Sequence, residues 1–309
     1  MSIAIPVKIC ASDGYLLSAT LFCSPTAPSN DRAAVMNAGA GIPAAYYARF
    51  ADWLADRGIP TLTYDYRGIG GSRPPSLRGF ETSVEEWGSK DCAAAVALLA
   101  SRFPGAAVTV IGHSIGCFLS GFVKNPIDIK YLVFVSPHTG FYGDYLPSVR
   151  PSMWFLWHLL MPLVTFSCGY FPGRFFGLPA DLPYGVALEW AQRRRPEFWW
   201  NLRQGNGELD TKARDELLAR FFNFAGDALT IRTTDDPFAT EVAALRVQAL
   251  FRRVRFESRL VDPNLLSMSK VGHFGFFRSN SRRQLWPIIG DWIQARSSHA
   301  DASSDDLGH

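Results

Sequence analysis

Short apolar runs alternate with amphipathic runs over the first 136 residues, and the alternation returns after about residue 226. The runs VTVIG (108–112) and YLVFVS (131–136) are almost continuously apolar, which is typical of strands covered on both faces. Residues 44–58 and 83–103 instead carry apolar residues at helical spacing. This alternation predicts an α/β fold with a mostly parallel, doubly wound sheet.

The pattern predicts the individual elements as well. Two apolar runs flank Asp13-Gly14, which is a hairpin signal. Ser83 and Glu86 form a capping-box pattern at the start of a helix. Further strands are expected at 33–39, 59–66, 106–112, 129–137, 228–234 and 254–261. Helices are expected at 44–58, 83–103, 115–123, 239–251 and 281–296.

The composition changes between residues 138 and 223. This segment is rich in Trp, Phe, Tyr, Pro and Arg and shows no alternation typical of strands. We interpret this segment as a mainly helical cap, inserted into a core made of residues 1–137 and 224–296. Residues 297–309 are small and polar and are expected to form a disordered tail. Several cap aromatics could form a pocket roof or the cap's own core: Trp154, Phe155, Trp157, Phe171, Phe175, Phe176, Trp199 and Trp200.

One cap stretch, residues 153–171, has no formal charge apart from His158 and approaches the length of a membrane span. Pro162 interrupts it, and a span needs about 20 apolar residues. We therefore expect a buried or lid helix and no stable span, with contact at a membrane surface as the alternative.

Charge and cysteine content exclude several function classes. The 309 residues carry a net charge of +3 with mixed signs, so no basic stripe indicates nucleic-acid binding. The run 193–195 is Arg-Arg-Arg and is expected to be a solvated helix end. Five cysteines form no C-x-x-C pair, which argues against a disulfide framework and a zinc site. We expect no metal and no cofactor. The N-terminus lacks a signal-peptide pattern, so a cytoplasmic location is expected.

The most informative motif is Gly112-His113-Ser114-Ile115-Gly116, which joins an apolar strand to an apolar run with helical character. Glycines allow the strand and helix to approach closely, and the residue at the apex is forced into a strained backbone conformation. Gly-x-Ser-x-Gly in this context is a nucleophile elbow. The motif predicts Ser114 as a catalytic nucleophile.

A serine hydroxyl needs a base, and a base needs a carboxylate to orient it. His273 follows the last predicted strand, is flanked by glycines and precedes the final helix, so we expect it to be the general base. Asp235 and Asp236 both follow an earlier strand, and we prefer Asp236 as the triad acid. His158 is expected to pack within the cap, whereas His299 and His309 lie in the tail.

The oxyanion of an acyl-transfer intermediate needs two backbone donors. We expect one at the N–H of Ile115 and the other in the loop 37–43, with Gly39 as first choice and Ala40 as second. We also place Ala40, His113 and His138 among the expected substrate-binding residues. His138 follows a strand and could reach the pocket, whereas the side chain of His113 is expected to point into the layer that supports the elbow.

Taken together, these residues resemble an α/β-hydrolase over about 1–136 and 226–296. The resemblance rests on the elbow, on the order Ser114, Asp236, His273, and on YDYRGIGGSRP (64–74), which is similar to a D-x-R-G-x-G-x-S loop. It further resembles a bacterial group of predicted α/β-hydrolases without an assigned natural substrate. The resemblance implies that Asp65 and Arg67 brace the site, and that residues 138–223 are the cap. The oxyanion loop departs from the family, since Asn37-Ala38 replaces the usual His-Gly.

The expected function is a serine hydrolase that cleaves a small to medium carboxylic ester or thioester through an acyl-enzyme. The aromatic cap favours an apolar acyl or aryl group as the small-molecule substrate. Acyl transfer or peptide cleavage on the same triad is an alternative. A second alternative is a non-catalytic ligand-binding protein that has kept the fold.

Overall fold

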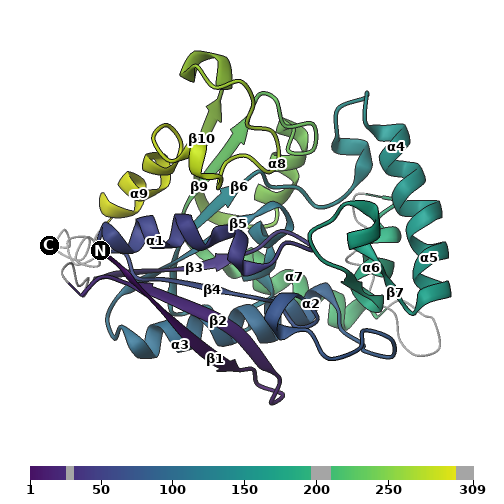
Figure 1. The fold of residues 1–309 in the computed structure, drawn as a ribbon, viewed down its shortest axis with the longest axis horizontal. Helices are drawn as coiled ribbons and strands as arrows, with labels where there is room; N and C mark the ends of the chain where they lie inside the picture. Colours follow the sequence, from purple (N-terminus) through teal and green to yellow (C-terminus); the bar gives the residue numbers. More distant parts are fainter. Residues whose placement is uncertain (26–30, 196–209, 297–309) are drawn as a thin grey trace, which may run out of the picture.

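The computed structural model describes residues 1–25, 31–195 and 210–296, and its centre is an eight-stranded sheet (Figure 1). The strand order is β1-β2-β4-β3-β5-β6-β9-β10. β2 runs antiparallel to β1 and β4, and the remaining neighbours are parallel. The strands are β1 (Ile3–Cys10), β2 (Leu16–Cys23), β3 (Arg32–Asn37), β4 (Thr61–Tyr64), β5 (Ala107–His113), β6 (Ile129–Val135), β9 (Ala225–Thr233) and β10 (Arg253–Val261). The mostly parallel α/β sheet predicted from the sequence is confirmed.

The helices of the core lie close to the predicted positions, apart from α7, which was not predicted individually. They are α1 (Ala48–Asp56), α2 (Val84–Glu86), α3 (Ala93–Arg102), α7 (Thr211–Asn223), α8 (Glu241–Gln248) and α9 (Trp286–Gln294). A π-helical stretch, Trp87–Cys92, joins α2 to α3, and the capping box between Ser83 and Glu86 is formed.

The helix predicted after the elbow is replaced by two 3-10 segments, η4 (Ser114–Cys117) and η5 (Leu119–Phe122). Gly116 and Gly121 lie in these segments and disfavour a regular helix. Gly121 also allows very close packing, because a β-carbon there would lie 2.2 Å from the ring of Phe221 on α7. Although α7 falls within the segment predicted as cap, it therefore packs against η5.

The rest of the insertion is mainly helical, as predicted. Its helical part is α4 (Arg150–Phe155), the π-helical η7 (Leu156–Leu160), α5 (Met161–Cys168) and α6 (Tyr184–Ala191). A small antiparallel pair, β7 (Tyr170–Phe171) and β8 (Leu182–Pro183), was not expected. In Figure 1, α4 and α5 form the edge of the molecule farthest from α9. No helix among the described residues is both long enough and apolar enough to cross a membrane.

Arg193 corrects the prediction of a solvated helix end. Its side chain is buried, and Nη1 donates a hydrogen bond to the carbonyl oxygen of Thr139 at 2.6 Å. The guanidinium also lies 4.6 Å from the ring centroid of Trp190, a cation–π distance. Arg193 thus ties α6 to the chain that leaves β6, because its fork of donors suits a buried carbonyl.

Candidate active site

The turn after β5 has the sharp geometry that the sequence predicts. Ser114 has φ +58°, a conformation that non-glycine residues rarely adopt and that is often found at functional sites. A β-carbon on Gly112 would lie 2.4 Å from Cα of Cys117, and one on Gly116 would lie 2.4 Å from the carbonyl oxygen of Asn37. The glycines are therefore required by close backbone approach, and the turn raises the Ser114 hydroxyl at the carboxyl edge of the sheet.

Ser114, His273 and Asp236 meet at this edge. The hydroxyl oxygen Oγ of Ser114 lies 3.0 Å from Nε2 of His273, and Nδ1 of His273 lies 2.9 Å from Oδ2 of Asp236. The other carboxylate oxygen, Oδ1 of Asp236, accepts hydrogen bonds from the backbone N–H groups of Phe238 and Ala239 at 2.9 and 3.1 Å. The arrangement matches the serine–histidine–carboxylate geometry used in acyl transfer.

The structure separates the two candidate carboxylates. Oδ2 of Asp235 accepts hydrogen bonds from the backbone N–H groups of Val271 and Gly272, at 2.8 and 2.9 Å. Asp235 therefore holds the loop that carries His273, while Asp236 contacts the imidazole. The two aspartates follow β9 in a turn, where the N–H of Asp236 bonds to the carbonyl oxygen of Thr233, and their side chains reach different partners.

Electrostatics favour an ionised Asp236 beside His273. Burial alone would raise the pKa of the Asp236 carboxyl group. The charge of His273 and the hydrogen bonds that Asp236 accepts outweigh burial and hold this pKa well below its usual range. A carboxylate in that state can orient the Nδ1–H of His273 and stabilise the imidazolium that forms after proton transfer.

His113 does not line the cavity, contrary to its inclusion among the substrate-binding residues. Its ring is completely buried behind Ser114. Nε2 lies 2.9 Å from the backbone carbonyl oxygen of His273, and Nδ1 lies 2.7 Å from the hydroxyl of Tyr47. Burial lowers the pKa of His113 to about 3, so its ring is neutral and both ring nitrogens are used in bracing contacts. The expectation of a supporting position matches this placement.

The loop after β3 contains both residues expected to supply the second oxyanion donor, Gly39 and Ala40. The N–H of Gly39, the first-choice oxyanion donor, donates to the hydroxyl oxygen of Tyr47 at 3.0 Å and is thereby occupied. Ala40 lines the cavity, and its N–H makes no hydrogen bond with any described residue. The N–H of Ile115 is likewise unengaged by described residues at the start of η4. The geometry therefore favours the amides of Ile115 and Ala40.

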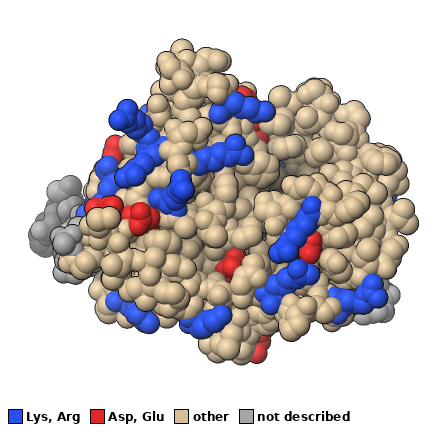
Figure 2. Space-filling view, in the orientation of Figure 1, with Lys and Arg blue, Asp and Glu red and all other residues tan. Residues whose placement is uncertain are grey.

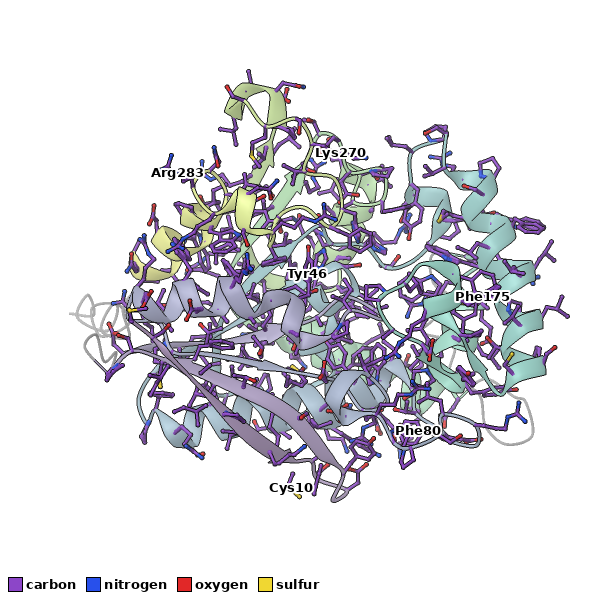
Figure 3. The ribbon with its side chains drawn as sticks, viewed as in Figure 1. Cys10, Tyr46, Phe80, Phe175, Lys270 and Arg283 are labelled. Atoms are coloured by element: carbon purple, nitrogen blue, oxygen red, sulfur yellow. The ribbon has the colours of Figure 1, made fainter. Side chains whose placement is uncertain are left out.

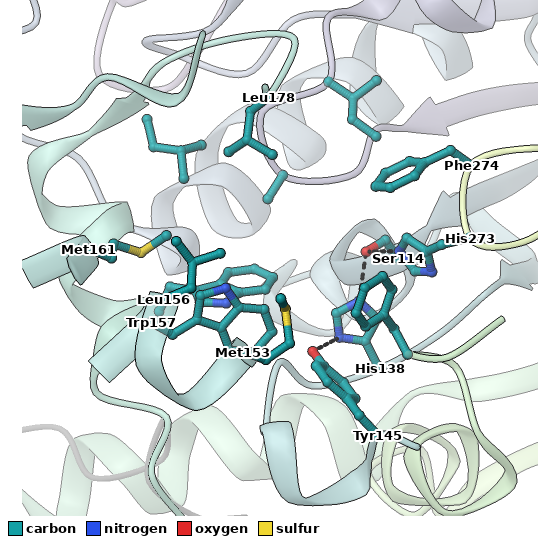
Figure 4. A pocket seen from close by; sticks show the side chains of 15 residues that line it. Ser114, His138, Tyr145, Met153, Leu156, Trp157, Met161, Leu178, His273 and Phe274 are labelled. Carbon is teal, nitrogen blue, oxygen red and sulfur yellow. Dashed lines mark hydrogen bonds between the residues drawn. The ribbon is translucent and has the colours of Figure 1, made fainter. Parts of the chain in front are cut away.

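The candidate site opens into a cavity of about 250 Å³ between the sheet edge and the cap (Figure 4). Its wall is almost entirely apolar. The residues that line it are Ala40, Ile42, Ser114, His138, Tyr145, Met153, Leu156, Trp157, Met161, Leu178, Leu182, Trp190, Phe238, His273 and Phe274. No carboxylate is among these described residues, so the cavity favours an uncharged group.

The structure divides the cap aromatics between the two expected roles, a pocket roof and the cap's own packing. Trp157 lines the cavity, whereas Trp154, Phe155 and Phe175 are exposed on the cap (Figure 3 labels Phe175). Phe171 and Phe176 stack on each other at 5.1 Å and belong to the cap's own packing. Trp199 and Trp200 lie outside the described residues.

Sequence reasoning missed most of the roof. Met153, Leu156 and Met161 lie on the inner face of the α4–α5 helix, and Trp190 lies on α6. Their spacing of three to five residues was a usable signal for one helix face, but nothing in the sequence indicated which face points to Ser114.

His138 enters the site as the sequence suggested. Its ring is buried, and Nε2 lies 2.9 Å from Oγ of Ser114 (Figure 4). Tyr145, which the sequence did not single out, lies with its hydroxyl 3.1 Å from Nδ1 of His138. His158 is instead buried in the cap, 2.6 Å from the carbonyl oxygen of Ala191, as a packing histidine.

The D-x-R-G loop is tied to neighbouring elements by its two charged side chains. Asp65 accepts hydrogen bonds from the backbone N–H groups of Ala44 and Gly71, at 2.7 and 2.8 Å. Arg67 forms ion pairs with Asp13 at 2.6 Å and with the fully buried Asp91 at 2.7 Å. No group of three or more potential metal ligands occurs among the described residues.

Comparison with known proteins bears on the fold. A family model described as serine aminopeptidase, S33, matches residues 28–170. No curated protein matches the sequence.

Solved structures match nearly the whole chain at low identity. A soluble variant of monoglyceride lipase from Saccharomyces cerevisiae, in complex with a substrate analogue, has a TM-score of 0.67 and 14% identity, covering 95% of both chains. A Pyrococcus furiosus esterase has a TM-score of 0.59 and 15% identity, covering 95% of this chain and 91% of its own. A 2-hydroxy-6-oxo-6-phenylhexa-2,4-dienoate hydrolase from Rhodococcus sp. strain RHA1 has a TM-score of 0.54 and 13% identity, covering 96% and 99%. At these identities the likeness concerns the fold.

Proposed function

We propose that this chain, which has the α/β-hydrolase fold, is a serine hydrolase that cleaves a small to medium carboxylic ester or thioester of an apolar acyl or aryl acid. The observation that carries the proposal is the line of contacts from Oγ of Ser114 to His273 and on to Asp236, at 3.0 and 2.9 Å. A hydroxyl placed in this way can be deprotonated as it attacks a carbonyl carbon.

The proposed reaction begins when Oγ of Ser114 attacks the carbonyl carbon while its proton moves to Nε2 of His273. The carbonyl electron pair moves to oxygen, where the N–H groups of Ile115 and Ala40 stabilise the oxyanion. His273 then protonates the leaving alcohol or thiol. Water, deprotonated by His273, attacks the acyl-enzyme and releases the acid and free Ser114.

The cavity supports the substrate class. A dry apolar cavity of about 150 Å³ is known to hold a benzene ring, so the 250 Å³ here suits an aryl or medium alkyl group. Larger ligand pockets reach about 1,000 Å³. We therefore expect the best substrates to have acyl chains of about four to eight carbons, as an order of magnitude from these volumes.

Peptide cleavage at a free amino terminus is less well supported, although the matching family model is described by that activity. An α-ammonium group in this cavity would need a buried negative partner, because an unpaired buried charge is very costly. No carboxylate is among the described residues that line the cavity, and Asp236, behind His273, is already paired with that ring.

The proposal is tested by hydrolysis of p-nitrophenyl esters from acetate to palmitate, with Ser114→Ala as the control. We expect turnover by the wild type to peak at medium chains and to be abolished in Ser114→Ala. Equal turnover by both proteins would overturn the triad. Adding competing alcohols or amines and analysing the products separates hydrolysis from acyl transfer.

We also propose that the cap touches a lipid surface. The outer apolar stripe, which we define as Phe155, Leu159, Leu163 and Phe166, runs along the exposed face of the helix whose inner face lines the cavity. Leu163 is 67% and Phe166 64% exposed. Residues 145–180 contain no carboxylate, and the exposed Arg150 and Arg174 flank the stripe.

A lipid surface would suit both the outer apolar stripe and the arginines that flank it. Figure 2 shows that the surface over α4 and α5 carries few charged side chains. An apolar helix face flanked by arginines can lie at the headgroup boundary and attract anionic lipids. Apolar esters dissolved in the lipid would then reach the cavity from the side of the cap. The five cysteines, all free thiols, suit a reducing compartment such as the cytoplasm.

A further inference from the structure

Oγ of Ser114 lies between two imidazoles. Besides His273, Nε2 of His138 lies 2.9 Å from this oxygen, which is at least as close as His273 at 3.0 Å (Figure 4). His138 comes from the chain that leaves β6, where Ser136 has φ +53°. A triad uses one histidine, so the second one needs its own explanation.

Backbone hydrogen bonding fixes the tautomer of His138. The N–H of Gly140 points to Nδ1 of His138 at 3.1 Å, and a backbone N–H can only donate. Nδ1 therefore carries a lone pair, and in the neutral ring the proton is on Nε2. The hydroxyl of Tyr145, 3.1 Å from the same nitrogen, must also donate to it.

The ring is held neutral by its surroundings. Burial lowers the pKa of His138 well below its usual value, and His273 lowers it further. The groups facing the ring are His273 at 5.2 Å between centroids, Tyr145 at 5.4 Å and Trp190 at 6.1 Å, with Arg193 and Asp236 as nearby charges. Of these, Asp236 alone favours protonation, and it is already paired with His273.

These facts determine the direction of every hydrogen bond at Ser114. His273 donates from Nδ1 to Asp236, so its Nε2 accepts the proton of Ser114. Nε2–H of His138 then donates to a lone pair of Oγ. We propose, on the basis of the proposed function, that His138 is a further catalytic residue, a neutral hydrogen-bond donor to Oγ of Ser114. It does not act as a base, because its Nε2 already carries a proton and its Nδ1 has no carboxylate partner.

The donor acts on the charge that Oγ carries during the reaction. During attack it aims the hydroxyl proton at His273. During deacylation the C–Oγ bond breaks and its electron pair goes to Oγ, while protonated His273 returns the proton. The N–H of His138 stabilises that departing oxygen and keeps its own proton throughout. A hydrogen bond to a charged group contributes enough to change a rate by about 10- to 100-fold.

Two substitutions separate this role from simple packing. In His138→Asn the amide oxygen can replace Nδ1 as the acceptor for Gly140, but no donor reaches Ser114. In His138→Gln the longer side chain can carry an amide N–H to the position of Nε2, and it cannot titrate. His158→Gln serves as the control, since it removes a buried imidazole of the cap away from the cavity.

The experiment measures kcat and KM with p-nitrophenyl butyrate from pH 5 to 9, together with the rate of labelling by a fluorophosphonate. We expect His138→Asn to lower kcat about 10- to 100-fold with KM changed little, and to slow labelling. His138→Gln should recover most of both rates, with the acid limb of the pH profile unchanged. His158→Gln should match the wild type.

Any of three results would overturn the inference. These are equal rates in His138→Asn and His138→Gln, a wild-type rate in His138→Asn, and loss of the acid limb of the pH profile in His138→Gln. Unfolding midpoints identify a variant that fails to fold. If His138→Asn does not fold, the kcat and labelling rate of His138→Gln relative to the wild type decide the question. Failure of the proposed function is distinguishable, because it would leave Ser114→Ala as active as the wild type. Labelling reports on Oγ even if no tested ester is turned over.

Discussion

Nε2 of His113 lies 2.9 Å from the backbone carbonyl oxygen of His273, so the residue before the nucleophile holds the loop of the base. Since a carbonyl only accepts, Nε2 of His113 carries the proton and Nδ1 accepts from the hydroxyl of Tyr47 at 2.7 Å. The oxygen of Tyr47 in turn accepts the N–H of Gly39 at 3.0 Å. This buried chain links the oxyanion loop, the elbow and the His273 loop.

Tyr47→Phe tests that chain. Removing the hydroxyl leaves the N–H of Gly39 and Nδ1 of His113 buried without partners, which costs about 1–3 kcal/mol for each unsatisfied group. We expect a lower free energy of unfolding in urea and a several-fold lower kcat, because the Ala40 amide is less firmly placed. Tyr142→Phe is the matched control, since the contacts of Tyr142 with described residues are ring contacts with Phe141 and His158, which Phe retains, and it should change neither quantity. An unchanged Tyr47→Phe protein would show that the chain is dispensable.

The two adjacent carboxylates provide a second prediction. Asp236→Asn should lower kcat by about 10⁴-fold, as loss of the orienting carboxylate does in serine hydrolase triads. Asp235→Asn should lower kcat far less and act mainly on stability, because Asp235 accepts two backbone N–H groups and does not touch His273. Steady-state kinetics and urea unfolding of both variants provide the measurement. A larger kcat loss in Asp235→Asn would reverse the assignment.

The fold was predictable because its signals are local. Buried parallel strands are apolar runs, Asp13-Gly14 marks a hairpin, and Ser83 with Glu86 marks a helix start. Chain order and turn chemistry likewise placed Ser114, His273 and Asp236 at one sheet edge. Each of these signals is read from a short stretch of sequence, although Ser114 lies far from Asp236 and His273 along the chain.

What the sequence did not reveal depends on tertiary contact. The occupied N–H of Gly39 follows from Tyr47, eight residues away on another element. The burial of Arg193 follows from the carbonyl of Thr139, 54 residues earlier. The donor role of His138 follows from the amide of Gly140, whose direction no sequence pattern encodes.

The neutral His113 predicts a pH dependence of stability. Burial lowers its pKa to about 3, whereas an unfolded histidine has a pKa near 6.5. Between these values the unfolded chain binds a proton that the folded chain does not, so the free energy of unfolding falls as pH falls below about 6.5. The loss is at most about 1.4 kcal/mol per pH unit for each such group.

Urea unfolding between pH 4.5 and 8.5 measures this slope, with His113→Asn as the variant that cannot titrate. We expect His113→Asn to be less stable at every pH but to lose less stability between pH 6.5 and 4.5. Above pH 7.5 the two slopes should coincide, which serves as the internal control. Parallel curves over the whole range would mean that His113 is not the group being titrated.

The outer apolar stripe predicts binding to lipid. Replacing Phe155, Leu163 and Phe166 together by Ser removes exposed apolar side chains, each contributing about 1–2 kcal/mol when transferred from water. Binding to phosphatidylglycerol–phosphatidylcholine vesicles, measured by co-sedimentation, should fall at least tenfold, because 1.4 kcal/mol is a factor of ten. Hydrolysis of soluble p-nitrophenyl butyrate should persist, since the inner face of the helix is untouched. Val242→Ser with Leu245→Ser, which removes comparably exposed side chains from α8, should bind vesicles like the wild type. Vesicle binding lost equally in both variants would point to general surface hydrophobicity, and binding retained in both would remove the cap as the contact.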